Sequence, residues 1–204
     1  MPQIEFAFRW LHVIAGITWI GFLYFFNFVN AVMQGKLDDA TKKAVNPQLM
    51  PRALWWFRWG AMITLLSGLV LFASIFLYTP GVGFGANLLL QGAEGGLSDR
   101  ARWIMWGMTF GTIMWFNVWF IIWPAQKALL SGKVTGDAAA PVRAKAGKFS
   151  KINTYLSGPM LVGMLGANHA NMHFGYGRLA ILVVLALAGV HVALFHAPRV
   201  GQSV

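Results

Sequence analysis

The stretch FAFRWLHVIAGITWIGFLYFFNFVNAV, residues Phe6 to Val32, decides the fold. A helix needs about 20 residues to cross about 30 Å of hydrocarbon, so this apolar run is long enough to span a bilayer. It carries one cation, Arg9, and one imidazole, His12, near its start. Because polar side chains at membrane depth are costly, His12 is the first candidate functional residue.

The composition of the chain is that of a membrane protein. Of its 204 residues, 57% are hydrophobic and 11% are charged, whereas about a quarter of the residues of a soluble domain are charged. The formal net charge is +10, but the cations lie mainly in short loops between apolar runs. That placement indicates membrane orientation and contact with anionic lipid, and it argues against nucleic-acid binding.

The chain contains no cysteine. This excludes disulfides, thiolate-held iron–sulfur clusters, catalytic thiols and a c-type haem attached through C-x-x-C-H. Any cofactor must be held by His, Met, carboxylate or backbone groups. The first apolar run has no basic segment before it, so we expect a retained first helix and not a cleaved signal peptide.

Five apolar spans predict an all-α fold, a polytopic membrane bundle of five transmembrane helices that forms a single membrane domain over residues 1–204. The helices are expected at about residues 5–33, 51–78, 99–130, 151–172 and 178–197. Pro51 is expected in the first turn of the second helix, where its missing N–H costs nothing. Asp99 is expected at the N-cap of the third helix.

Charged and aromatic residues indicate how the helices are oriented. The loops at residues 34–50 and 131–150 carry most of the Lys and Arg, so the positive-inside rule places the N-terminus outside and the C-terminus in the cytoplasm. Tryptophans are expected in an outer belt (Trp10, Trp103, Trp106) and an inner belt (Trp55, Trp56, Trp59, Trp123). Glycines in the third and fourth helices are expected to allow close helix packing: Gly107, Gly111, Gly158, Gly163 and Gly166.

This topology brings three histidines to one membrane level, because His12 lies near the outer end of the first helix and His169 and His173 lie near the outer end of the fourth. The last two are spaced i, i+4 and should share a helix face. His12 and His169 can clamp haem b as axial ligands, or all three histidines can hold copper or zinc. The alternative is that they are interfacial histidines bonded to water or backbone. Arginines near the outer surface are available for haem propionates: Arg9, Arg102 and Arg178.

Further polar residues gather toward the inner half of the expected spans: Asn27, Asn30, Arg58, Asn117, Asn153 and His191. Asparagine commonly forms hydrogen bonds between membrane helices, and the same groups can line a pocket for a quinone or another substrate. Asp and Glu are almost absent from the spans. This disfavours a carboxylate proton relay or an ion pump.

Four segments combine unusual polar and Trp positions in a fixed order: RWLHVIAGITWIGFLYFFNFVN (9–30), LMPRALWWFRWGA (49–61), NVWFIIWPAQKAL (117–129) and NTYLSGPMLVGMLGANH (153–169). They resemble the N-terminal membrane domain of bacterial membrane-bound urate hydroxylases, and the resemblance covers nearly the whole chain. A fainter similarity, confined to the first helix, is to the membrane protoporphyrinogen oxidases, which also place a His early in that helix and are linked to haem b.

The resemblance implies a redox module of the bacterial inner (cytoplasmic) membrane. In the urate hydroxylases, a C-terminal cytochrome c domain takes the electrons onward. This chain has no C-x-x-C-H, so we expect it to lack that domain and to use a separate cytochrome c or other subunits of a membrane complex. The leading hypothesis is electron transfer through haem b between a quinone or small reductant and an outside acceptor. The alternatives are a cofactor-free structural or assembly subunit of a larger complex, and urate hydroxylase activity with a separate cytochrome c.

Overall fold

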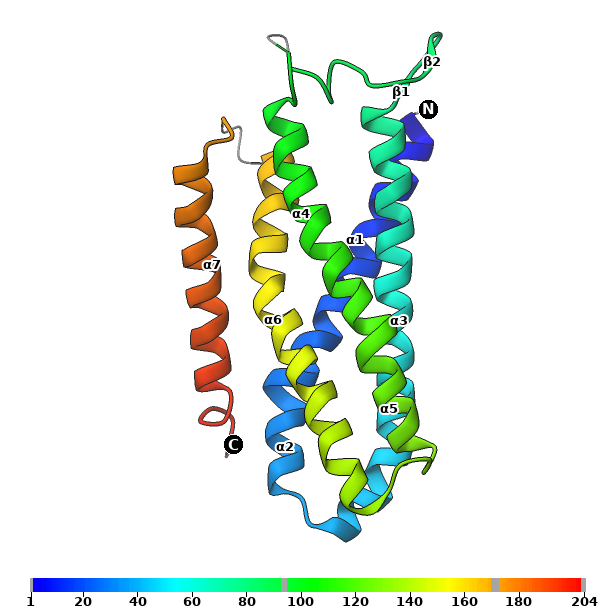
Figure 1. The fold of residues 1–204 in the computed structure, drawn as a ribbon, viewed down its shortest axis with the longest axis vertical. Coiled ribbons are helices and arrows are strands. Elements are labelled where there is room, and N and C mark those ends of the chain that lie inside the picture. The colour runs from blue at the N-terminus through cyan, green and yellow to red at the C-terminus, as the bar shows by residue number, and fades with distance from the viewer. Residues whose placement is uncertain (1, 93–94, 170–172, 203–204) are drawn as a thin grey trace.

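A computed structural model describes residues 2–92, 95–169 and 173–202 as a bundle of long helices (Figure 1). The N-terminus lies at the end that carries a short hairpin, and the C-terminus lies toward the opposite end. The described elements, in chain order, are α1 (Pro2–Tyr24), η1 (Phe25–Asn30), α2 (Ala31–Lys36), α3 (Asp39–Phe76), β1 (Tyr78–Thr79), β2 (Gly83–Phe84), α4 (Asp99–Phe116), η2 (Asn117–Ile122), α5 (Trp123–Leu130), η3 (Gly136–Ala138), α6 (Ala139–His169) and α7 (Tyr176–His196).

Two of the long rods contain a π-helical segment. The first rod runs through α1, η1 and α2, and the third runs through α4, η2 and α5. In both, the α-helical pattern gives way to the wider i to i+5 pattern for six residues. The rods match the expected first and third helices in extent, but nothing in the hydrophobic pattern of the sequence predicts the π-helical segments.

Four helical stretches of the described chain are long and apolar enough to cross a membrane: Gln3–Lys36, Asp39–Phe76, Asp99–Leu130 and Tyr176–His196. This is consistent with a multi-pass membrane protein. The expected fourth span falls in α6, which is long enough but is not among these four. Its buried face carries Asn153, Thr154 and Ser157. These side chains pack against other helices, so α6 does not need to be uniformly apolar.

The second and fourth long helices begin well before the expected positions. Most of the region expected as a polar loop at residues 34–50 belongs to α3, and Pro51 lies inside that helix instead of in its first turn. Asp38 caps α3, since its carboxylate accepts a hydrogen bond from the Thr41 N–H at 2.8 Å. This bond also lowers the pKa of Asp38 from its ordinary value. Likewise, α6 begins at Ala139, within the expected loop at residues 131–150.

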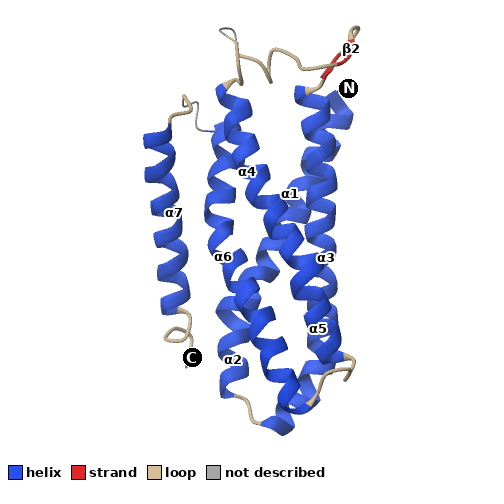
Figure 2. Cartoon of the chain, viewed as in Figure 1, coloured by secondary structure: helices blue, strands red, loops and turns tan. Residues whose placement is uncertain are grey.

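The connection between α3 and α4 lies at the N-terminal end of the bundle and includes two short antiparallel strands (Figure 2). Tyr78 pairs with Phe84 and Thr79 with Gly83. The next helix is capped by Ser98, whose side chain accepts from the Ala101 N–H at 3.1 Å. The prediction that Asp99 is the cap is therefore wrong by one residue, because Ser98 has the extended backbone that a cap requires.

Glycines bring helices into backbone contact, as the sequence predicts for α4 and α6 but not for α1 and α3. A Cβ at Gly107 would lie 2.9 Å from the Met164 backbone nitrogen, so α4 and α6 cross there without side chains between them. Gly60 has the same role between α3 and the backbone of α1 at Trp19. Gly111 differs, since a Cβ there would meet only the Met160 and Met164 side chains at ordinary distances.

The tryptophans follow the expected belts only in part. Trp10 and the inner Trp55, Trp56 and Trp59 are exposed on the bundle surface. Trp103 is buried with 1% of its surface exposed, so its prediction as a member of the outer belt is wrong. A Cβ at Gly166 would lie 2.9 Å from the Trp103 ring. The indole occupies the space that this glycine leaves between α4 and α6.

Candidate functional site

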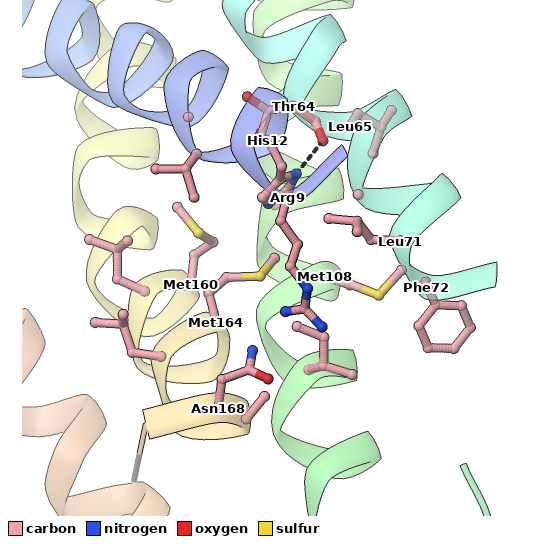
Figure 3. A pocket seen from close by; sticks show the side chains of 18 of the residues that line it. Arg9, His12, Thr64, Leu65, Leu71, Phe72, Met108, Met160, Met164 and Asn168 are labelled. Carbon is pink, nitrogen blue, oxygen red and sulfur yellow. Dashed lines mark hydrogen bonds between the residues drawn. The ribbon is translucent and has the colours of Figure 1, made fainter. Parts of the chain in front are cut away.

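A cavity of about 700 Å³ lies among α1, α3, α4 and α6, toward the N-terminal end of the bundle (Figure 3). Small-molecule and cofactor sites typically have volumes of about 300–1,000 Å³. Most of its lining is aliphatic or aromatic, and a few polar groups stand among these side chains. Arg9 and His12 come from α1, Thr64 from α3, Arg100 from α4, and Asn168 and His169 from α6.

His12 is held in this cavity by the backbone of α3. Its Nδ1 lies 2.9 Å from the Thr64 carbonyl oxygen, to which only a protonated nitrogen can donate. The same nitrogen lies 3.2 Å from the hydroxyl of Ser67, which itself donates to the Ile63 carbonyl. With the proton on Nδ1, a neutral imidazole keeps the lone pair on Nε2. Histidines that ligate metals are usually held in this way.

Gly68 leaves the space that the His12 ring occupies. A Cβ at Gly68 would lie 3.0 Å from Cε1 and 3.3 Å from Nδ1 of His12, closer than such atoms normally approach. A side chain at this position would therefore require the His12 ring or the helices to shift by a few tenths of an ångström. The sequence gives no sign of this dependence, because Gly68 meets His12 only once α1 and α3 are packed together.

The three histidines that the sequence places at one level do not form one site. His12 and His169 both line the cavity, but His173 bonds through Nδ1 to the Asp99 carboxylate at 2.9 Å and is almost fully exposed. The described part of α6 ends at His169, and His173 is not helical, so the expected i, i+4 relation is absent. Among the described residues, no group of three or more His, Cys, Asp or Glu side chains is placed to hold a metal ion.

The arginines of the cavity are Arg9 and Arg100. Arg9 is paired with Glu5 at 2.6 Å, and Arg100 donates to the Asn168 side chain at 2.9 Å. Arg102 does not line the cavity and lies 4.0 Å from Asp99. Arg178, the third arginine expected near the propionates, is also outside it and donates to the His173 carbonyl.

Sequence reasoning missed Arg100 and three methionines. Arg100, Ile104 and Met108 line the cavity at i, i+4 and i+8 of α4, a spacing that marks one helix face. Met160 and Met164, four residues apart on α6, face Met108 across the cavity in Figure 3. A thioether sulfur can ligate haem iron or copper. This spacing was the available signal, but it identifies a site only when the facing helices are known.

A second cavity of about 450 Å³ adjoins the first. Arg9, Ile75 and Arg100 line both cavities. The second also reaches Tyr78 to Pro80 and Asn87 in the connection between α3 and α4, at the N-terminal end of the bundle. The two arginines therefore stand between the His12 cavity and that end of the molecule.

The six inner polar residues line neither of these cavities. Asn27 donates to Ser150 at 2.8 Å, and Asn117 donates to Asn153, which donates to the Met114 carbonyl. Asn30 is buried and accepts from Gln34. These asparagines lie in or against η1 and η2. Most of them form hydrogen bonds between helices and do not line a pocket.

The remaining two residues of that set lie apart from the asparagines. His191 bonds to the Tyr155 hydroxyl at 2.9 Å and is exposed on α7. The Arg58 guanidinium stacks on Trp123, with its central carbon 3.9 Å from the ring centroid. The structure therefore divides the predicted inner pocket into an asparagine network and two separate polar positions.

Comparison with protein families gives a match to the family described as urate oxidase N-terminal, over residues 31–90 and 86–203. The match includes α3, α4, α6 and α7, but the part of α1 that carries Arg9 and His12 precedes it. Comparison with curated proteins and with solved structures gives no match. Because the family model matches well over half of the chain, the chain belongs to the urate oxidase N-terminal family.

Proposed function

We propose that the chain is a membrane redox module that binds haem b in the His12 cavity, where His12 would hold the iron. The observation that carries the proposal is the hydrogen bond from His12 Nδ1 to the Thr64 carbonyl. It holds the ring in the tautomer that leaves Nε2 free for a metal, and Gly68 leaves room for that orientation. When bound, haem b supplies one-electron transfer.

The residues around His12 suit a large, flat and mostly apolar group with acidic substituents. The aliphatic lining excludes water from its faces. Arg9 and Arg100 stand at one side of the cavity, where their guanidinium groups can donate charge-assisted hydrogen bonds to the propionates. Arg100 thus takes the place that the sequence analysis gave to Arg102.

A second residue that would hold the iron comes from α6. His169 is the ligand expected from the sequence and lines the same cavity as His12. Met164 also lines it and is the competing donor. Methionine ligation raises the reduction potential relative to two histidines. The variants His169→Ala and Met164→Leu therefore distinguish the ligand pair His12 and His169 from the pair His12 and Met164. Loss of the true ligand should change both the spectrum and the reduction potential, and loss of the other residue should change neither.

Electrons would pass between a quinone or small reductant and a separate cytochrome c. The support for a cytochrome acceptor is the resemblance to urate hydroxylases, whose membrane domain is joined to one. The basic loops would place the N-terminal end, with its two cavities, on the outer side of a bacterial inner membrane. The path from the cavity outward would then run beside Arg9 and Arg100.

The visible spectrum tests the proposal. Protein purified from haem-replete cells is expected to show the reduced-minus-oxidised bands of a b-type haem. His12→Ala should lose them, whereas the matched variant His173→Ala should keep them, because His173 lies outside the cavity. A colourless wild-type protein that keeps its partner chains through purification would overturn the proposal in favour of a structural subunit.

Urate hydroxylation is a narrower form of the same proposal. Membranes that contain the chain and an added cytochrome c should consume urate, and membranes with His12→Ala should not. If wild-type membranes show the haem bands but leave urate untouched, the redox module stands and its substrate is another reductant.

A further inference from the structure

Arg58 lies in a candidate membrane-spanning helix, α3, and has no anionic partner among the described residues. Its Nε is buried and has no hydrogen-bond partner among the described residues. None of the described ion pairs includes it. Leaving a charged donor unpaired in a low-dielectric environment is costly. An intramembrane cation of this kind calls for a partner outside the chain.

Two indole rings lie against the Arg58 guanidinium. Its central carbon lies 3.9 Å from the centroid of the Trp123 ring and 5.7 Å from that of Trp119. The Trp119 Nε1–H also donates to the Arg58 carbonyl at 3.1 Å, which joins η2 to α3 at this point. Stacking occupies the face of the planar guanidinium, and its two terminal Nη groups, which are not among the buried unpaired atoms, stay accessible to a ligand.

The position of Arg58 along α3 corresponds to the headgroup level of one leaflet. Phe76 ends α3 at the N-terminal end of the bundle, and Arg58 lies about 27 Å from it along the helix at 1.5 Å per residue. The hydrocarbon of a bilayer is about 30 Å thick. Trp55, Trp56 and Trp59, all exposed on the same stretch of helix, mark the same level as an aromatic belt.

The anionic group available at the headgroup level is the phosphate of a phospholipid. The edge of a guanidinium fits two phosphate oxygens at once. Lys127 on α5, four residues after Trp123, is exposed and favours an anionic surface nearby. We infer that Arg58, held between Trp119 and Trp123, binds the phosphate of an anionic phospholipid in the leaflet at the basic end of the bundle. This inference does not depend on the haem proposal.

Lipid retention tests the inference. The full chain is reconstituted in nanodiscs with equal amounts of dioleoyl phosphatidylglycerol and dioleoyl phosphatidylcholine, extracted and washed, and the retained lipids are counted by mass spectrometry. Wild type should retain phosphatidylglycerol preferentially. Arg58→Gln should reduce that preference about fivefold, because it removes both the charge and the N–H groups that face the phosphate. Arg52→Gln is the matched control, since Arg52 is exposed on the same helix and is bonded to Gln48.

Three results would overturn the inference. They are an unchanged preference in Arg58→Gln, an equal loss in Arg52→Gln, and displacement of the lipid by excess inorganic phosphate in the wash, which would assign the site to the free anion. If Arg58→Gln does not give monodisperse protein, Trp123→Leu decides instead. This variant keeps the Arg58 cation and removes the Trp123 ring on which it stacks, so it should also lower the preference for phosphatidylglycerol. An unchanged preference would contradict the role given to the two tryptophans.

Discussion

His12 depends on the glycine opposite it. Gly68→Ala would place a methyl group 3.0 Å from His12 Cε1, and we predict that it moves the ring from the Thr64 carbonyl and lowers the haem content of the purified protein. Haem per protein and the midpoint of thermal unfolding in detergent are measured together. Gly189→Ala on α7, where a Cβ would meet nothing within 4 Å, gains the same helix propensity and should keep its haem. Equal haem content in the two variants would contradict the dependence.

Single residues could be predicted from the sequence only where their chemistry is rare in its surroundings. His12 stands out in an apolar run, and the cavity contains it. Arg100 and Gly68 do not stand out, because their importance comes from what faces them across the bundle. His173 was wrongly placed for a local reason: the i, i+4 argument requires a continuous helix, and His173 is not helical.

At the scale of elements, the crossing of α4 and α6 distinguishes two glycines of one G-x-x-x-G pair. Gly107→Ala would bring a methyl group to 2.9 Å from the Met164 backbone nitrogen, whereas Gly111→Ala meets only flexible methionine side chains. We predict that Gly107→Ala lowers the free energy of unfolding by about 1–3 kcal/mol, as overpacking does. Gly111→Ala should be neutral or slightly stabilising. Thermal unfolding of both variants checks this, and similar midpoints would show that the helices separate easily at the crossing.

The buried asparagine pair between η2 and α6 permits a second stability prediction. Asn153→Ala leaves the Asn117 side-chain amide without its partner and removes one of the two N–H groups that donate to the Met114 carbonyl. An unpaired buried polar group costs about 1–3 kcal/mol. Asn117→Ala should cost less, because Asn153 keeps its bond to Met114. The double variant should lose less than the sum of the single losses. Strictly additive losses in chemical unfolding would argue against a coupled pair.

Helix locations follow from hydropathy where the chain meets lipid, and not elsewhere. The apolar spans at residues 5–33 and 99–130 correspond closely to observed rods. The first turns of α3 and α6 were missed because helix outside the hydrocarbon carries Lys, Asn and Pro as readily as a loop does. The π-helical segments were missed because no pattern in the sequence marks them. Asn27 in η1 and Asn117 in η2 bond to Ser150 and Asn153 on α6, contacts that exist only once the helices are packed together.

For the whole molecule, sidedness is open to a direct experiment because the chain has no cysteine. Val82→Cys adds a single thiol in the connection at the N-terminal end, where Val82 is 85% exposed. Lys133→Cys adds one at the basic end. If the N-terminal end faces outside, a membrane-impermeant thiol reagent should label the first variant in intact cells and the second only after lysis. The opposite labelling pattern would reverse the topology.

The fold of the whole chain was the easiest part to predict, and the site was the hardest. Composition and five apolar runs are enough for an all-helical membrane-type bundle. The cavity requires four helices to be placed against one another, and its polar groups come from residues as distant as Arg9 and His169. No local sequence pattern predicts which residues of the four helices line the cavity.

Each π-helical segment amounts to a single residue inserted into an α-helix. One residue turns a helix by about 100°, so side chains after η1 and η2 face directions that an uninterrupted helix would not give them. Ancestral forms without the insertions would keep the cavity-facing residues of α1 and α4 but present different faces of α2 and α5 to their neighbours. Alignments with relatives that lack these segments should therefore carry one-residue gaps at 25–30 and at 117–122. Without those gaps, Asn30 and Trp123 would be compared with residues that point elsewhere.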